Sequence, residues 1–194
     1  IINLIENEGV THFISGMAIG VDMYAAEIVL GLKASYPGIT LESAIPCESQ
    51  AAKWSEALRD RYFDIASKCD KETLIQTHYT PDCMDKRNRY MVDHADVLIA
   101  VWDGSPSGTG KTVNYALRQG KPVVDINPRS LNIEQIARNS LSHLQIEGMA
   151  EAIFIFASTL SLHFRFRLWQ ASCSGYAFHR IASVLPGTFQ SSYF

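Results

Sequence analysis

The sequence predicts an α/β protein with a mostly parallel sheet, and three observations lead to this prediction. Short β-prone apolar runs alternate with helical patterns along residues 10–126. The connections between these runs are short, as in consecutive βαβ units. The clearest strand, Val97–Trp102, ends abruptly in a glycine-rich loop, and a new helical pattern follows that loop. This order of strand, loop and helix is typical of a parallel sheet with helices packed on it.

Each element is predicted from a local pattern. Helices are expected where apolar residues recur at helical spacing, over residues 1–8, 21–35, 50–68, 84–94 and 112–119. Strands are expected in short β-prone runs that end at turn-forming residues, over residues 10–14, 39–45, 73–77, 97–102 and 122–126. The signal weakens after about Leu131, although Ile153–Leu168 is strand-like and Ala171–Phe194 shows no clear period. We therefore expect one α/β domain at residues 1–130 and a C-terminal extension at residues 131–194.

Composition limits the classes of function. The chain has 194 residues, 47% of them hydrophobic, which is enough for one core. A formal net charge of −3 argues against a nucleic-acid partner. The four cysteines form no CxxC pair, which indicates a reducing, cytoplasmic location and neither a disulfide framework nor a metal site. No apolar run reaches the roughly 18 residues of a membrane span, and no signal peptide is evident, so no membrane partner is expected.

Four polar loops follow predicted strands. They are Ser15–Asp22, Pro46–Gln50, Thr77–Arg87 and Asp103–Thr112. Ligands of open parallel sheets bind at the carboxyl ends of the strands. Several polar loops on that one edge favour a ligand site there more strongly than any single loop does.

The first of these loops is framed by two glycines. Gly16 and Gly20 supply conformational freedom and room for a phosphate between the strand and the next helix. The spacing is not GxGxxG, so a dinucleotide fingerprint is not supported. The alternative is a plain turn whose following helix is capped by Asp22.

The loop before the helix at 112–119 invites comparison with a P-loop. Gly110-Lys-Thr112 has the required ending, but Ser105 occupies the place of the first glycine and Gly104 lies one residue too early. A P-loop needs a fixed number of backbone N–H groups around the phosphate, so the altered spacing argues against it. A helix N-terminus still favours anions, which makes the backbone of 107–109 a candidate phosphate site.

The predicted helix at 84–94 brings an arginine toward the same edge. Met84, Arg87, Asn88 and Met91 recur at i, i+3, i+4 and i+7, so they share one face that should pack on the sheet. Arg87 would then point at the strand ends. The alternative is an arginine whose stem packs while its charged head reaches water.

These loops resemble those of the SLOG superfamily. Ile14–Asp22 is similar to its SGGAxGxD loop, while Ala44–Trp54, Arg87–Asp93 and Val101–Thr109 look like the YpsA-like members, whose function is unknown. The resemblance covers about residues 1–128. It implies a Rossmann-like three-layer fold that binds a nucleotide or a nucleotide-derived ligand. Our hypothesis is that such a protein acts as a sensor or regulator. Family members usually begin with a strand carrying a Thr-Gly-His-Arg-like loop, so we expect this chain to lack that first strand.

The resemblance and the loops together give a set of candidate ligand-binding residues. The glycine turns would hold the phosphate, and Arg87, which is also the candidate catalytic residue, would neutralise its charge. Asp22 or Asp103 would accept a hydrogen bond from a ribose hydroxyl. Residues 46–50 would line the part of the site that holds the base. The full set is Ser15, Gly16, Met17, Gly20, Asp22, Pro46, Gln50, Arg87, Asn88, Asp103, Gly104, Ser107, Gly108 and Thr109. No cofactor is expected, and a homo-oligomer is left open.

Two other functions remain as alternatives. The LOG enzymes of the superfamily cleave nucleoside monophosphates, and Met84-Asp-Lys-Arg87 matches their M-x-x-R-K motif except that Asn88 replaces lysine. The carboxylate of their second motif falls on Thr112, which cannot supply acid–base chemistry near neutral pH. DprA-like binding of single-stranded DNA is the second alternative, and it would need a basic groove with aromatic platforms.

Overall fold

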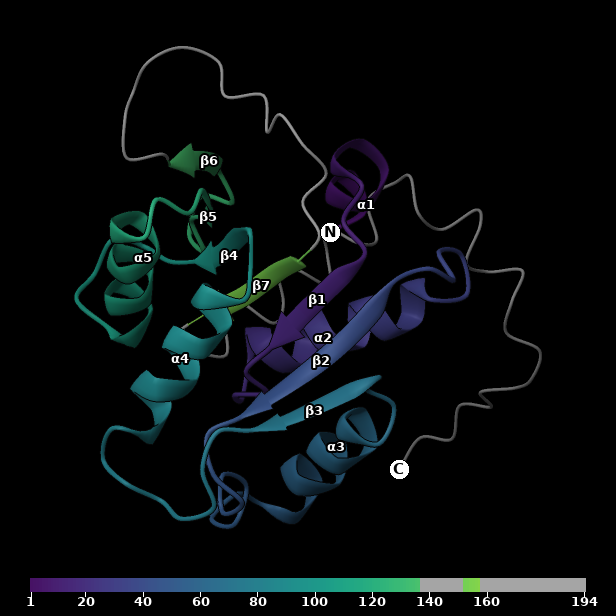
Figure 1. The fold of residues 1–194 in the computed structure, drawn as a ribbon, viewed down its shortest axis with the longest axis vertical. Coiled ribbons are helices and arrows are strands. Elements are labelled where there is room, and N and C mark those ends of the chain that lie inside the picture. The colour runs from purple at the N-terminus through teal and green to yellow at the C-terminus, as the bar shows by residue number, and fades with distance from the viewer. Residues whose placement is uncertain (137–151, 158–194) are drawn as a thin grey trace, which may run out of the picture. The chain divides into compact units, whose positions relative to one another are not determined.

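The computed structural model describes residues 1–136 and the backbone of residues 152–157, which form helices around one seven-stranded sheet (Figure 1). The helices are α1 (Ile2–Glu8), α2 (Val21–Leu32), α3 (Glu56–Ala66), α4 (Cys83–Asp93) and α5 (Gly108–Arg118). The strands are β1 (His12–Ser15), β2 (Thr40–Ile45), β3 (Lys71–Leu74), β4 (Val97–Val101), β5 (Val123–Ile126), β6 (Ile133–Ile136) and β7 (Ala152–Ala157).

The sheet is mostly parallel, as the alternating pattern predicts. The strand order is β3-β2-β1-β7-β4-β5-β6, and only the β5–β6 pair is antiparallel. The place between β1 and β4 is taken by β7, which pairs in parallel with both. Strands β6 and β7, which both follow residue 130, thus belong to the sheet. The division of the chain into a domain and an extension at residue 130 stays a prediction. The parts of the two C-terminal segments 153–168 and 171–194 that follow residue 157 lie outside the described residues.

The two faces of the sheet bury different side chains. On one face, Phe13 and Leu41 pack with residues of α2 and α3 such as Met23 and Ile65. On the other face, Ile14, Ala44 and Leu98 pack with residues of α4 and α5, among them Met91 and Val113. Neighbouring residues of a strand point to opposite faces, so Phe13 and Ile14 of β1 belong to different cores. Strand β4 is apolar throughout and contributes to both cores. The architecture is therefore three-layered and Rossmann-like, and its strands β1, β2, β3 and β4 run parallel to one another.

Four predicted elements differ from the structure by three residues or more at one end. The helix predicted at 21–35 ends at Leu32. The helix predicted at 112–119 begins at Gly108, because Ser107 caps it and glycine in the first turn does not prevent a capped start. The helix predicted at 50–68 is a series of turns up to Ser55 and a helix only from Glu56. The strand predicted at 73–77 lies at Lys71–Leu74, where it pairs with β2. Strand β6 was not predicted, since Ile133–Ile136 is short and mostly exposed.

No helix within the described residues combines the length and apolar character that crossing a bilayer requires.

Candidate functional site

The loop that links β1 to α2 is closed by its own side chains. Ser15 Oγ donates to the backbone oxygen of Asp22, and it accepts from the amide of Met17 at 3.2 Å. The amide of Ala18 donates to Asp22 Oδ2 at 3.3 Å. Met17 has φ 55°, a left-handed conformation that a non-glycine residue adopts only when its surroundings hold it there. The loop is therefore a built turn, and two of its amides are already used internally.

Asp22 does not cap α2. The N-cap position is Gly20, with φ 108°, and no side chain caps the helix there. Asp22 lies in the first turn and reaches back to the loop instead, so the alternative of a plain capped turn is wrong in this respect.

The carbonyl oxygen of Gly16 is the point where other elements meet this loop. Gln50, in the turns after β2, donates from Nε2 to Gly16 O at 3.2 Å and to Met17 O at 2.9 Å. Arg87 Nη1 on α4 also donates to Gly16 O. A Cβ on Gly16 would lie 2.7 Å from Arg87 Cζ and 2.9 Å from Asp22 Oδ2. Glycine is thus required at position 16 because the Arg87 and Asp22 side chains approach its Cα closely. The sequence alone does not show this requirement.

Arg87 is buried rather than open to solvent. Its side chain is 3% exposed, so the alternative of an arginine whose head reaches water is wrong. Burial lowers the pKa of the guanidinium, and the carboxylate of Asp22 opposes that shift. Of the two methionines predicted to pack on the sheet beside Arg87, Met91 is fully buried and Met84 is 38% exposed.

A chain of hydrogen bonds runs from Arg87 to the start of α5. Arg87 Nε donates to Asn88 Oδ1 at 2.8 Å, and Asn88 Nδ2 donates to Thr112 Oγ1 at 3.1 Å. Thr112 Oγ1 in turn donates to the carbonyl oxygen of Gly108 at 3.1 Å. The β1–α2 loop, α4 and the first turn of α5 are therefore connected through buried side chains, although they are far apart in sequence.

Backbone amides at the N-terminus of α5 lack acceptors among the described residues. Ser107 Oγ accepts from the amide of Gly110 at 3.1 Å, and the Ser107 carbonyl accepts from Lys111. Within the part of the chain that the structure describes, the amides of Gly108 and Thr109 have no acceptor. Thr109 Oγ1 is buried and has no partner among these residues either. An anion would complete the first turn of this helix.

Gln50, at the other end of this series of hydrogen bonds, has an acceptor atom without a partner among the described residues. Its Nε2 is identified by the two carbonyl oxygens that it faces, because only the amide NH₂ group can donate to them. Its Oε1 is consequently directed away from them, and it is buried without a partner in the described part of the chain. A hydroxyl or N–H donor is the partner that this oxygen lacks.

The remaining candidates lie on the strand-end loops but take no part in these contacts. Pro46 is buried after β2, and Gly104 sits in a left-handed turn with φ 84°. Asp103 accepts from the amide of Ser105 at 3.1 Å and from Arg129 Nη2 at 3.1 Å. Its hydrogen bonds with Ser105 and Arg129 lower the pKa of the Asp103 carboxyl. Asp103 thus has partners already, unlike Gln50 Oε1.

The cap of α5 can be tested directly. Replacing Ser107 by alanine removes the acceptor of the Gly110 amide, and should lower the free energy of unfolding by about 1 kcal/mol. Urea unfolding followed by circular dichroism measures the change. Ser55→Ala is the matched control, because Ser55 is the N-cap of α3 but makes no side-chain capping bond. Equal effects of the two substitutions would contradict the assigned role of Ser107.

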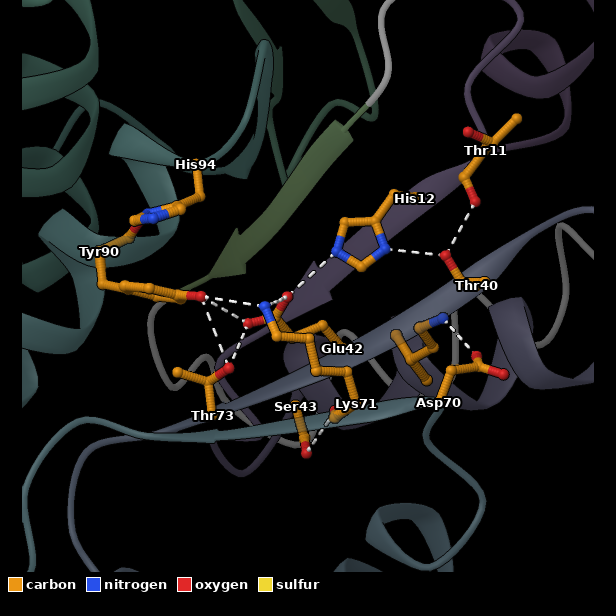
Figure 2. Close-up of polar contacts among 11 residues, drawn as sticks. Thr11, His12, Thr40, Glu42, Ser43, Asp70, Lys71, Thr73, Tyr90 and His94 are labelled. Atoms are coloured by element: carbon orange, nitrogen blue, oxygen red, sulfur yellow. Dashed lines mark hydrogen bonds and ion pairs between the residues drawn. The ribbon is translucent and has the colours of Figure 1, made fainter.

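A second polar cluster surrounds Glu42, and the sequence analysis missed it (Figure 2). Glu42, 1% exposed in the middle of β2, accepts from four side chains. These are Lys71 Nζ at 3.0 Å, Thr73 Oγ1 at 2.7 Å, Tyr90 Oη at 2.8 Å and, through Nε2 at 3.1 Å, His12. Burial works to raise the pKa of Glu42, but hydrogen bonds led by His12 outweigh it and lower the pKa to about 2. Glu42 is the one charged residue of β2, and a charge inside a predicted strand was the available signal.

Comparison of the sequence with known proteins finds relatives whose names assign no activity. A family model described as the YspA SLOG family matches residues 1–139. The "Uncharacterized SPbeta prophage-derived protein YoqJ" of Bacillus subtilis is 34% identical over 125 residues, which are 58% of this chain and 73% of that protein. "UPF0398 protein BH1768" of Halalkalibacterium halodurans is 36% identical over 113 residues, 55% of this chain and 59% of that protein. "UPF0398 protein SH1465" of Staphylococcus haemolyticus is 28% identical over 107 residues, covering 54% and 57%. The chain thus aligns with less than two thirds of these two UPF0398 proteins.

Proposed function

Since this chain belongs to the YspA SLOG family, we propose that it binds a nucleotide or a nucleotide-derived phosphorylated ligand at the carboxyl edge of its sheet. The observation that carries the proposal is the convergence on Gly16. The β1–α2 loop, the turns after β2 and helix α4 meet at its carbonyl oxygen, and α4 continues the connection to α5. Among the described residues, an unpaired acceptor remains at the Gln50 end of this assembly and unpaired donors remain at the α5 end.

The start of α5 would hold the phosphate. The amides of Gly108 and Thr109 and the Thr109 hydroxyl supply donors, and the partial positive charge of the helix N-terminus favours an anion. Thr112 would support them indirectly through the Gly108 carbonyl. The Gly16–Gly20 turn would approach the ligand from the other side.

Arg87 would support the site indirectly, through its hydrogen bonds and its buried charge. Its guanidinium donates to Gly16 O and to Asn88 Oδ1, so it fixes two neighbouring segments while contributing a buried positive charge. A charge inside the protein is less screened than one at the surface, and it favours an anionic ligand nearby.

Gln50 would face the less charged end of the ligand. Its bare Oε1 would accept a hydrogen bond from a ribose hydroxyl or from an N–H group of the base. A buried acceptor would not help to bind phosphate alone, because the acceptor oxygen and the anion repel each other. The pairing of donors at α5 with an acceptor at Gln50 therefore favours a ligand that has both a phosphate and hydrogen-bond donors.

Isothermal titration calorimetry tests the proposal with a panel of nucleoside monophosphates, ADP-ribose, nucleotide sugars and ribose 5-phosphate. We expect saturable binding of at least one nucleotide, and Thr109→Val should weaken it about tenfold because one hydrogen bond is lost. Ser67→Ala is the control, since it also removes a hydroxyl but lies at the end of α3. Absence of binding across the panel by a correctly folded chain would refute the proposal.

The same panel separates binding from catalysis. A LOG-type hydrolase would release free base from a nucleoside monophosphate, and chromatography detects the base. We expect none, because Thr112 stands where those enzymes carry a carboxylate and is already bonded to Asn88 and Gly108. Release of base that disappears in Arg87→Ala would replace our proposal with the hydrolase. A salt-dependent gel shift with single-stranded DNA would favour the DprA-like alternative.

A further inference from the structure

We propose that Tyr79, in the loop between β3 and α4, is the surface on which the aromatic base of the ligand stacks. The inference rests on the proposed function and specifies it, because it requires a ligand with a planar base and not merely a phosphorylated sugar.

Both ends of the β3–α4 loop are attached to the proposed site. At its start, the amide of Glu48 donates to Thr77 O at 3.3 Å, and Gln50, two residues after Glu48, holds Gly16. At its end, the loop continues into α4, where Arg87 Nη2 lies 3.9 Å from the sulfur of Met84 in the first turn. The segments that follow β2 and β3 accordingly run side by side in Figure 1. The middle of the loop must therefore project from the same edge of the sheet as the candidate loops.

The loop is held in one conformation by side-chain hydrogen bonds. Gln76 Nε2 donates to His78 O at 2.6 Å and to Thr80 Oγ1 at 2.8 Å, so it fixes the residues on both sides of Tyr79. Lys86 on α4 closes the network, with Nζ 3.2 Å from Gln76 Oε1 and 3.1 Å from Asp82 Oδ2. These bonds favour the loop conformation that exposes Tyr79, and they reduce the conformational entropy lost when a ligand binds.

Tyr79 itself takes no part in this network. Its side chain is 64% exposed, and within the described residues it has no ring contact or hydrogen bond. Met84, also an exposed apolar residue, follows in the first turn of α4. A tyrosine has only two side-chain torsions, so it loses little conformational entropy when it stacks on a planar ring. Every base has such a planar face, so the platform fits the base of a nucleotide.

The experiment compares two ligands with the intact chain. Calorimetry measures the affinity for a nucleoside monophosphate and for ribose 5-phosphate, which shares the phosphate and the sugar but lacks the base. Tyr79→Ala should weaken the nucleotide about tenfold or more and leave ribose 5-phosphate unchanged. Tyr79→Phe should retain the nucleotide affinity, because it retains the ring.

Phe63→Ala is the matched control, since Phe63 is an equally exposed aromatic residue, 60% exposed, on α3. It should leave both affinities unchanged. Equal nucleotide affinities of Tyr79→Ala and the wild type would overturn the inference while the proposed function stands. Equal affinities of the wild type for the two ligands would overturn it as well. If the wild type binds neither ligand, the proposed function fails together with it.

Discussion

Gly16→Ala is expected to lower the free energy of unfolding by about 3 kcal/mol and to abolish ligand binding. The added Cβ would lie 2.7 Å from Arg87 Cζ and 2.9 Å from Asp22 Oδ2, so both groups would have to move. Neither can move cheaply, because Arg87 and Asp22 are buried and charged. Displacing Arg87 would also break its bond to Gly16 O and loosen the connection to Asn88.

Urea unfolding and calorimetric titration of the same preparation measure the two effects of Gly16→Ala. Gly31→Ala is the control, because a Cβ on Gly31 meets no atom within 4 Å and the residue lies in helix α2. It should be neutral or stabilise the chain by up to about 1 kcal/mol, since alanine is the better helix former. If Gly16→Ala changes stability no more than Gly31→Ala does, the close packing at Gly16 is not what maintains the loop.

Glu42→Gln should lower the free energy of unfolding by about 3 kcal/mol at neutral pH, and the loss should shrink in acid. The lowering of the Glu42 pKa from 4.5 to about 2 corresponds to that much stabilisation of its charged form in the folded state. Because the folded-state pKa is the lower one, this stabilisation is present above pH 4.5. It is lost progressively as the pH falls from 4.5 toward 2.

Urea unfolding of both chains at a series of pH values between 7 and 3 measures this dependence. Glu72→Gln provides the comparison, because Glu72 lies on the neighbouring strand β3 but is exposed. The difference between Glu42→Gln and the wild type should narrow in acid, whereas Glu72→Gln should resemble the wild type at every pH. A pH-independent difference would mean that Glu42 stabilises the sheet by packing and not by its charge.

The elements that sequence reasoning predicted well are those with strong local patterns. The strand Val97–Trp102 and the helix at 84–94 coincide with β4 and α4 to within one residue, because both carry clear apolar periodicity. The start of α5 was misjudged by four residues, since three of its first four positions hold glycine or threonine, which are weak helix formers. Its capping by Ser107 outweighs that weakness, and capping depends on backbone geometry.

The candidate site was predicted as a set of loops but not as a set of contacts. Gly16, Gln50, Arg87, Asn88 and Gly108 do belong to one hydrogen-bonded assembly. That Arg87 would be buried could not be foreseen, because burial depends on how α4 packs against β1 and β2. The cluster around Glu42 was missed for the same reason, since its donors come from β1, β3 and α4.

The amino-acid sequence by itself determined that this protein is a mostly parallel α/β domain of the SLOG type, with polar loops at the ends of its strands. These properties follow from local spacing and from short motifs, which neighbouring residues are sufficient to specify. Only the tertiary structure decided that Gly16 must be glycine, that Arg87 lies beneath its loop and that Gln50 and Thr109 keep unpaired polar atoms. Those properties depend on side chains that meet across dozens of residues, and the distances between them exist only once the chain is folded.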